Sequence, residues 1–167
     1  YSMCSAPDEK YLAVTVKEEN YVTGQTKYPP LLSPLLVRRI NRGTRMTITG
    51  FTGPYVLPHD IESKTDHLVH LCAGSGSVPN FSIIKHALAR RMKLRHTFIY
   101  TNKTWHDIIF RAQLDQLCEM YPDELRVIHC ITREENVERR GANYRRGRIS
   151  AEVIAQHVPD LSAAAYF

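Results

Sequence analysis

From residue 66 onward, short apolar runs alternate with longer stretches of helical periodicity, and this alternation restricts the possible folds more than any other feature. Parallel strands need helical crossovers between them, so the alternation predicts an α/β domain built on a parallel sheet. We expect strands at 68–72, 96–100 and 125–131 and helices at 80–92, 105–120 and 150–157. The final residues, Ala165-Tyr166-Phe167, indicate the start of a further strand.

Residues 1–58 have a different pattern, in which alternating runs with β-branched residues are separated by turns. Residues 11–17 and 44–49 are expected to be strands. Ser33-Pro34 is expected to cap a short helix at 35–40. Strands, turns and one short helix together predict a partial antiparallel β-barrel or sandwich.

The linker between the two patterns is expected at 59–65, so we divide the chain into a first domain at 1–62 and a second at 63–167. The abrupt ends of the sequence predict a fragment, with the second domain truncated at its C-terminal end. No apolar run approaches the roughly 20 residues of a membrane span. We therefore expect no membrane association and a cytoplasmic protein.

A glycine-rich turn, Gly74-Ser75-Gly76-Ser77-Val78-Pro79, joins the first strand and first helix of the second domain. In this place, backbone N–H groups and the helix N-terminus can face a pyrophosphate. A lone Gly-x-Gly also fits a plain turn, but its context favours dinucleotide binding. Pro79 occupies the position of the third glycine in a Rossmann fingerprint, which argues against an ordinary dehydrogenase.

Arginines gather after the strand at 125–131, at the edge where open α/β sheets bind ligands. Such a cluster predicts a phosphate ligand, and Tyr144 is available to stack on adenine. A solvated basic loop and a nucleic-acid-binding surface are the alternatives on charge alone. The second is weakened by the lack of a recognisable nucleic-acid-binding module and by a net charge of only +5. The cluster comprises Arg133, Arg139, Arg140, Arg145, Arg146 and Arg148.

The sequence predicts neither a metal site nor a disulfide framework. His67 and His70 are three residues apart, a spacing that places them on opposite faces of a strand. The cysteines show no Cys-x-x-Cys spacing, so we expect reduced, buried thiols and no iron–sulfur centre. They are Cys4, Cys72, Cys118 and Cys130.

In their order along the chain, these features resemble the ferredoxin–NADP reductase family, and the resemblance covers nearly the whole sequence. Residues 72–79 resemble the family's Gly-x-Gly-x-x-Pro loop, in which a proline is expected. Residues 107–111 resemble its Asp-Ile-Ile-Phe-Arg helix start. Thr132-Arg133-Glu134 and Gly147-Arg148-Ile149 resemble the Ser-Arg-Glu and Gly-Arg-Ile motifs of its adenosine 2′-phosphate site.

The resemblance implies an NADP-binding site in the second domain. The glycine-rich loop would place the pyrophosphate, and Arg133 and Arg148 would hold the 2′-phosphate. Lys103 stands where NADP-preferring members place a basic residue, and Tyr144 where plant-type members stack a tyrosine on adenine. The implied residues are Gly74, Ser75, Gly76, Pro79, Lys103, Thr132, Arg133, Tyr144 and Arg148.

The resemblance also implies a flavin site in the first domain. Tyr1-Ser2 resembles the end of an Arg-x-Tyr-Ser motif, whose tyrosine lies against the isoalloxazine and whose serine hydrogen-bonds near flavin N5. Ser2 is therefore the implied catalytic residue. Val16-Lys17 resembles a backbone contact with the ring, and Ser33 with Leu36 resembles a Ser-x-x-Leu element that holds the FAD pyrophosphate. The implied residues are Tyr1, Ser2, Val16, Lys17, Ser33 and Leu36.

The sequence also departs from the family pattern. The loop at 21–32 is longer than the usual link to the serine helix, and we expect it to affect how the FAD adenine is held. Phe51 replaces the proline of the family's Gly-Pro-Phe-Gly turn. The arginine of the flavin motif and a terminal Cys-Gly-Pro element are absent from the sequence.

The implied activity is that of an NAD(P)H-dependent flavin oxidoreductase with FAD and NADPH as cofactors, NADH being less favoured. NADPH would give a hydride to the flavin, which would pass single electrons to a ferredoxin, a flavodoxin or an oxygenase component. The alternatives on the same fold are a non-catalytic or electron-bifurcating electron-transfer subunit. A basic nucleic-acid-binding domain is the remaining rival, and we expect no nucleic acid as a partner.

Overall fold

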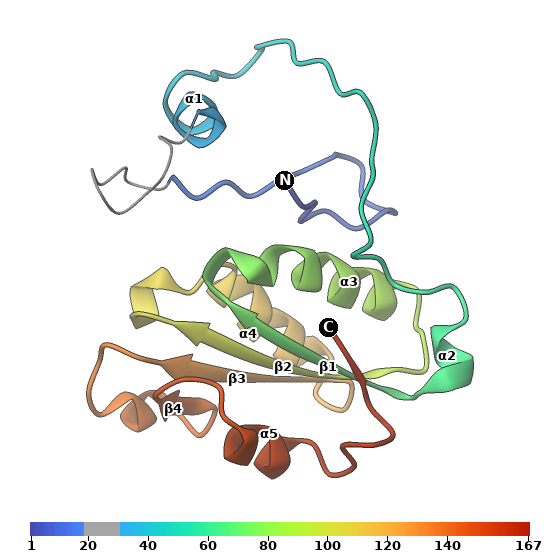
Figure 1. The fold of residues 1–167 in the computed structure, drawn as a ribbon, viewed down its shortest axis with the longest axis vertical. Helices are drawn as coiled ribbons and strands as arrows, with labels where there is room; N and C mark the ends of the chain where they lie inside the picture. Colours follow the sequence, from blue (N-terminus) through green and yellow to red (C-terminus); the bar gives the residue numbers. More distant parts are fainter. Residues whose placement is uncertain (19–30) are drawn as a thin grey trace.

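The computed structural model describes residues 1–18 and 31–167. The described residues form one sheet of five parallel strands, in the order β4-β3-β2-β1-β5 (Figure 1). The expected α/β domain with a parallel sheet is therefore confirmed, including the last strand. The strands are β1 (His67–Ala73), β2 (Arg95–Asn102), β3 (Leu125–Ile131), β4 (Tyr144–Arg146) and β5 (Ala165–Tyr166). The main helices are α3 (Ser77–Ala89), α4 (Arg111–Met120) and α5 (Ala151–His157).

Helices cover both faces of the sheet, which explains why its central strands are buried along most of their length. α3 and α4 lie on one face and α5 lies on the other (Figure 1). The core on the side of α3 and α4 includes Phe81, Ile84, Leu88, Phe98, Leu114 and Val127. The core on the side of α5 includes Ile99, Ile128, Cys130, Val153 and Ile154.

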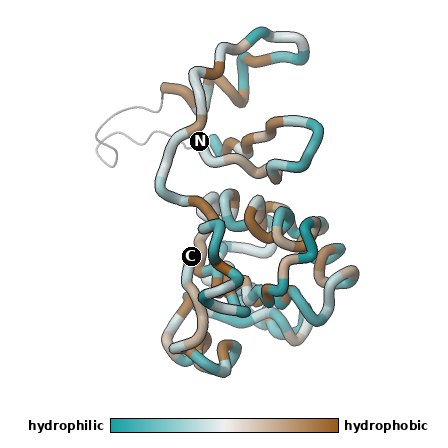
Figure 2. Tube along the Cα trace, turned by 90° about the vertical axis from the view of Figure 1, so that its right-hand side faces the viewer, coloured by the Kyte–Doolittle hydropathy of each residue, from teal (hydrophilic) through white to brown (hydrophobic). Residues whose placement is uncertain are grey.

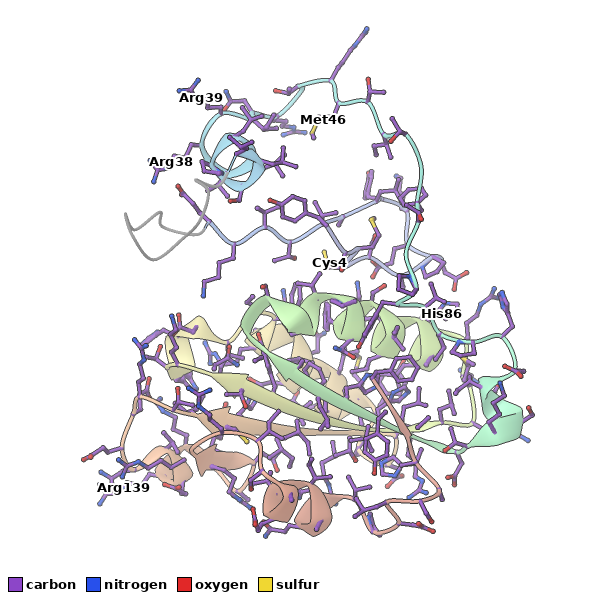
Figure 3. The ribbon with its side chains drawn as sticks, viewed as in Figure 1. Cys4, Arg38, Arg39, Met46, His86 and Arg139 are labelled. Atoms are coloured by element: carbon purple, nitrogen blue, oxygen red, sulfur yellow. The ribbon has the colours of Figure 1, made fainter. Side chains whose placement is uncertain are left out.

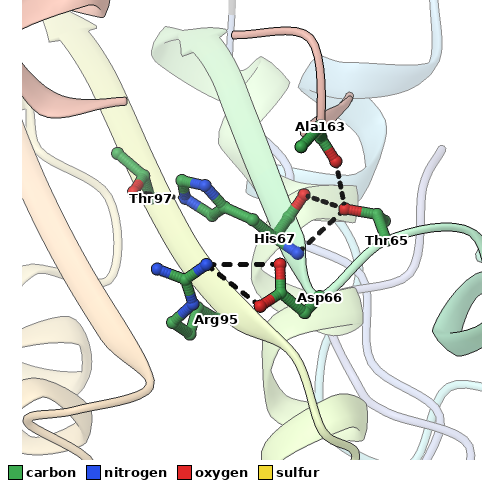
Figure 4. Close-up of polar contacts among 6 residues, drawn as sticks. All are labelled: Thr65, Asp66, His67, Arg95, Thr97 and Ala163. Carbon is green, nitrogen blue, oxygen red and sulfur yellow. Dashed lines mark hydrogen bonds and ion pairs between the residues drawn. The ribbon is translucent and has the colours of Figure 1, made fainter. Parts of the chain in front are cut away.

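Polar contacts fix the strands at the end of the sheet where β1 and β2 begin (Figure 4). Asp66 pairs with Arg95 through both carboxylate oxygens, at 3.2 and 3.1 Å. The Oγ1 atom of Thr65 accepts from the backbone N–H of His67 at 2.9 Å and donates to the carbonyl of Ala163 at 2.6 Å. These bonds hold β1, β2 and the approach to β5 in register, which leaves the opposite edge available for a site.

The predicted antiparallel barrel is not formed by the described N-terminal residues of this chain. The expected strands at 11–17 and 44–49 have irregular backbone, apart from one antiparallel bridge between Met3 and Val14. Hydrophobic side chains of this part remain exposed, as for Ile48 at 61%, and Figure 2 shows hydrophobic stretches in it. A β-branched pattern specifies a stable sheet only where several strands or a packed face support it, and the described segment has neither.

The short helix α1 (Leu32–Arg38) begins earlier than expected. Leu31 occupies its N-cap without any side-chain cap, so the prediction that Ser33 is the N-cap is wrong. Ser33 lies instead in the first turn and is buried. Pro34 is tolerated beside it because the first N–H groups of a helix have no intrahelical acceptor. The long loop predicted at 21–32 lies, except for its last two residues, outside the described residues.

A short helix, α2 (Ile61–Lys64), forms within the segment expected to be the linker. Its buried side chain, Ile61, packs with Leu68 and Leu94 in a core cluster under the sheet. α2 therefore belongs to the packed part of the molecule. The domain boundary between 62 and 63 falls inside this helix and stays a prediction.

The N-terminal segment docks on α3 through polar contacts. The hydroxyl of Ser82 donates to the carbonyl of Ser5 at 2.7 Å, and Lys85 pairs with Glu9 at 2.6 Å. Figure 3 shows Cys4 at this junction, above α3. In each of these contacts, a side chain of α3 binds a polar group of the N-terminal segment.

The helix expected at 105–120 is interrupted. A 3-10 turn, η2 (Trp105–Asp107), comes first, and α4 begins only at Arg111. Between them, Phe110 has a φ of 61°, a left-handed conformation that non-glycine residues seldom adopt. Its ring stacks on Phe81 with the centroids 4.1 Å apart, and this packing offsets the strain. Helical periodicity carries no signal for such a break.

Candidate functional site

The order of the strands places a binding edge beside β1. The chain runs outward from β1 through β2 and β3 to β4, and then returns to place β5 on the other side of β1. In open α/β sheets, ligands bind at the carboxyl ends of strands where the order reverses in this way. The expected dinucleotide loop, Gly74–Pro79, directly follows the carboxyl end of β1.

The loop is a tight turn held by a tyrosine from the neighbouring strand. Gly74 has a φ of +50° and nothing within 4 Å of the position of a Cβ atom, so the turn is open to a ligand on that side. The hydroxyl of Tyr100 donates to the Gly74 carbonyl at 2.9 Å and accepts from Ser77 Oγ at 3.0 Å. Its other partner is the N–H of Ile109, at 3.3 Å. Tyr100 thus ties the loop to β2 and to the segment before α4.

Tyr100 was not among the residues expected from sequence. A tyrosine inside an apolar strand is read as a core residue, and the ring of Tyr100 is fully buried. The available signal was its hydroxyl, since a buried phenol needs a hydrogen-bond partner. Burial raises the pKa of this hydroxyl, so it stays protonated and able to donate.

Three of the expected cationic residues gather at the carboxyl ends of β2, β3 and β4. The backbone N–H of Arg133 donates to the carbonyl of Lys103 at 2.8 Å, which joins the two loops directly. The N–H of Gly147 donates to the carbonyl of Ile131 at 2.8 Å, which brings the segment with Arg148 next to the end of β3. Lys103, Arg133 and Arg148 are exposed, and no ion pair within the described ranges includes any of them. The arrangement suits an anionic ligand.

Other arginines of the cluster are bound within the protein. Arg140 pairs with Glu134 at 3.2 Å, and Arg146 pairs with Glu135 at 3.5 Å. Arg145 donates to two backbone carbonyls, at 2.6 and 2.9 Å. The six arginines therefore do not act as one basic surface, which weakens the nucleic-acid alternative.

The ring of Trp105 lies next to these cations, and no sequence motif indicated this residue. Its ring lies 3.4 Å from the guanidinium of Arg111 and 4.7 Å from that of Arg140. Its backbone N–H donates to Glu134 at 2.7 Å. Glu134, part of the expected Thr132-Arg133-Glu134 motif, thus joins the loops after β2 and β3.

The expected adenine partner, Tyr144, stacks on His129 with the ring centroids 4.9 Å apart. Burial, together with the nearby positive charge of Arg111, lowers the pKa of His129 to about 4, so the imidazole is neutral. Tyr144 is half-buried, with one ring face on His129. The side chain is therefore fixed, and the adenine contact stays a prediction.

Thr132 has a supporting position. Its backbone N–H and its hydroxyl both donate to the carbonyl of Asn102, at 3.0 and 3.2 Å. Asn102 itself is buried at the end of β2, and its side-chain amide has no partner among the described residues. The sequence did not indicate Asn102, because a single asparagine after a strand is most often a turn residue.

A cavity of about 310 Å³ brings the expected flavin residues against the glycine-rich loop. Its N-terminal side is formed by Tyr1, Ser2, Thr15, Lys17 and Ser33, and its other side by Ser75 and Val78. The expected residues Val16 and Leu36 are half-buried and do not line it. The two sites, implied by motifs about 40 to 70 residues apart in the sequence, thus line one cavity.

Across 1–18 and 31–167, no group of three or more His, Cys, Asp or Glu side chains is arranged to hold a metal ion. No helix in those ranges has the length and apolar character to cross a membrane. The expectation of buried thiols is met by Cys72 and Cys130, whereas Cys4 and Cys118 are partly exposed.

Comparison with known families identifies the sheet domain. The family described as the oxidoreductase NAD-binding domain matches residues 71–167. The match begins within β1 and includes the glycine-rich loop, the cationic residues and Tyr144. It therefore contains the whole expected nucleotide site.

Curated relatives extend the similarity. Nitrate reductase (NADH) 1 of Zea mays is 35% identical over 106 residues, which are 60% of this chain and 17% of that protein. The ferredoxin reductase component of the 3-ketosteroid-9-alpha-monooxygenase of Mycolicibacterium smegmatis is 34% identical over 132 residues. That match covers 77% of this chain and 33% of the relative. The chain thus spans a third or less of these relatives.

Solved structures share the fold. The CS-b5R domains of human Ncb5or match 96% of this chain and 44% of their own, with a TM-score of 0.62 and 22% identity. Ferredoxin-NADP+ reductase from Plasmodium falciparum, solved with 2′P-AMP, matches 81% of this chain and 53% of its own. Its TM-score is 0.62 at 21% identity, so both likenesses concern the fold alone.

Proposed function

Because the chain belongs to the ferredoxin–NADP reductase superfamily, through its oxidoreductase NAD-binding domain at residues 71–167, we propose that it binds NADPH within a flavoprotein reductase. This reductase moves a hydride from NADPH to FAD and passes single electrons to an acceptor protein. The cavity shared by Ser2 and Ser75 carries the proposal. Hydride transfer requires nicotinamide and flavin in contact, and that cavity joins both expected sites.

The nucleotide is held along the carboxyl edge of the sheet. The loop at Gly74–Pro79 binds the pyrophosphate. The turn has free space at Gly74 and leads directly into the N-terminus of α3. Lys103, Arg133 and Arg148 take the 2′-phosphate, and Tyr144 takes the adenine. Among the described residues these cations have no ion-pair partner, which supports NADPH over NADH, although several relatives, such as nitrate reductase (NADH) 1 of Zea mays and NADH-cytochrome b5 reductase 2 of Homo sapiens, are named as NADH enzymes.

The flavin is held by the N-terminal residues, and residues 1–62 contribute part of a flavin-binding barrel in the complete protein. Tyr1 and Lys17 line the shared cavity and provide an aromatic face and a cation, which suit a flavin ring and a phosphate. Ser33 adds a hydroxyl on the same side. Exposed hydrophobic side chains of this part, such as Ile48, are consistent with further strands packing on it.

The cofactors and the protein have different roles in the reaction. When bound, the nicotinamide and the flavin supply hydride and single-electron chemistry. The protein's residues bind and orient: the loop after β1 positions the nucleotide, and the hydroxyl of Ser2 hydrogen-bonds a flavin ring nitrogen. The acceptor is a ferredoxin-like protein or an oxygenase component, a choice supported by the name of the Mycolicibacterium relative.

The specificity for NADPH is tested on the complete, FAD-loaded protein. Steady-state kcat/KM is measured with NADPH and NADH for wild type and Arg133→Ala. We expect the NADPH/NADH ratio to fall about tenfold or more, because one charge-assisted contact with the 2′-phosphate is lost.

The control is Arg126→Ala, which removes an exposed arginine from the opposite end of β3. Its ratio should equal that of wild type. An unchanged ratio in Arg133→Ala would remove Arg133 from the site, and absence of activity with both nucleotides would refute the proposed function.

A further inference from the structure

A chain of buried polar side chains runs under the glycine-rich loop. The imidazole nitrogens His96 Nδ1 and His70 Nε2 lie 3.1 Å apart, and His70 Nδ1 lies 2.8 Å from Asn80 Oδ1. The Nδ2 atom of Asn80 then donates to the carbonyl of Gly76 at 3.0 Å. All three side chains are at most 2% exposed. The chain therefore leads from the core between β1 and β2 to the backbone of the loop.

The hydrogen bonds have one consistent direction. The carbonyl oxygen of the Asn80 amide can only accept, so His70 carries its proton on Nδ1 and accepts from His96 at Nε2. His96 then also carries its proton on Nδ1. Burial lowers the pKa of His70 to about 4 and that of His96 to about 3, so both rings are neutral, as this arrangement requires.

A second support reaches Asn80 from outside the sheet domain. The hydroxyl of Tyr55 donates to Asn80 Oδ1 at 2.8 Å, so this oxygen accepts from two partners. The ring of Tyr55 meets Phe167 edge-on at 6.0 Å, and Phe167 stacks on His70 at 5.8 Å. Asn80 is thus fixed from both sides, by β1 and by the segment that leads into the sheet domain.

We propose that Asn80 is the positioning residue of the nucleotide loop: supported by His70 and Tyr55, it holds the Gly76 carbonyl and so fixes the peptide planes that face the pyrophosphate. This inference rests on the proposed function. A peptide unit is planar, so fixing the Gly76 carbonyl also fixes the N–H of Ser77, which donates to the carbonyls of Gly74 and Ser75 and thereby closes the turn. The loop lies at a helix N-terminus, where N–H groups without intrahelical acceptors are available to phosphate.

The position of Asn80 predicts which part of the ligand it affects. Gly76 belongs to the loop after β1, whereas the proposed 2′-phosphate residues lie beyond β2, β3 and β4. NADP+ has a pyrophosphate, whereas 2′-AMP has only the adenosine and the 2′-phosphate. A loss of positioning should therefore lower the affinity for NADP+ and leave the affinity for 2′-AMP unchanged. A general loss of structure should lower both affinities.

The test is calorimetric titration of the 167-residue chain with NADP+ and with 2′-AMP. We expect Asn80→Ala to lower the affinity for NADP+ about tenfold, because one hydrogen bond is lost. The affinity for 2′-AMP should stay within about twofold of wild type. Tyr55→Phe removes one support and should weaken NADP+ by a smaller factor. Gln116→Ala removes an exposed amide from α4 and should match wild type.

Asn80→Asp covers the case in which the alanine variant does not fold. The aspartate keeps an acceptor for His70 and Tyr55 but has no donor for the Gly76 carbonyl, so NADP+ should be weakened here too. Unchanged NADP+ affinity in Asn80→Asp, or equal losses for NADP+ and 2′-AMP, overturns the positioning role alone. A wild-type chain that binds neither ligand overturns the proposed function and this inference with it.

Discussion

At the scale of single residues, the site depends on groups that hold backbone in place as much as on groups that would touch a ligand. Tyr100 binds the loop at Gly74, and Glu134 joins the loops that carry Lys103 and Arg133. The sequence indicated the ligand-facing residues because motifs record chemistry. It could not indicate Tyr100, whose role depends on which carbonyl the folded chain places near its hydroxyl.

Replacing Tyr100 by phenylalanine should lower the free energy of unfolding by about 1–3 kcal/mol. The change leaves the N–H of Ile109 without its acceptor and removes the donor to the Gly74 carbonyl. Urea unfolding gives the value. Tyr166→Phe is the control, because the hydroxyl of Tyr166 is exposed and should contribute almost nothing. Equal effects of the two variants would contradict the role given to Tyr100.

At the scale of elements, the sheet could be predicted because its signal is local. The run Leu125–Ile131 is mostly apolar, with Arg126 and His129 as its polar members, and is bounded by polar turns, so its range was predicted without error. The break at Phe110 could not be predicted, since its left-handed backbone is stabilised by the ring of Phe81. The strands expected at 11–17 and 44–49 failed because alternation cannot supply neighbouring strands.

The packing of α4 on the sheet gives a second prediction. Leu114 is 1% exposed, and Leu114→Ala should lower the free energy of unfolding by about 2–5 kcal/mol through lost contacts and a cavity. Met120→Ala is the matched control on the same helix, because Met120 is 54% exposed and should change stability by about 0.5 kcal/mol or less. Thermal or urea unfolding measures both. Similar losses in both variants would show that α4 is not packed as described.

At the scale of the whole molecule, the site depends on contact between segments that are distant in sequence. The first residues reach the loop after β1 because the N-terminal segment docks on α3, for instance through Ser5 and Ser82. Motifs predicted both halves of the cavity separately. Their shared space could not be predicted, since it follows from this docking and from the return of the chain to β5.

The buried histidines make stability depend on pH. Burial lowers the pKa of His70 and His129 to about 4 and that of His96 to about 3. In the unfolded chain these histidines bind protons as the pH falls below about 6.5, whereas in the folded chain they stay neutral. The free energy of unfolding therefore has its full value above about pH 6.5 and falls between about pH 6.5 and 4. Each histidine should contribute up to about 1.4 kcal/mol per pH unit.

Urea unfolding at several pH values within that range measures the slope. His129→Phe should reduce the slope, since one of the buried histidines with a lowered pKa no longer titrates. The phenylalanine ring can still stack on Tyr144, so the fold should be retained. A slope that does not change in this variant would mean that His129 is not a buried neutral group.

Calorimetric titration of the chain with NADP+, NAD+ and a short DNA duplex tests most directly whether the carboxyl edge of this sheet binds NADP through its phosphates. We expect one saturable NADP+ site per chain, with an affinity at least about tenfold higher than for NAD+ and lowered by salt. No saturation with NADP+, or tighter binding of the duplex than of NADP+, would contradict it.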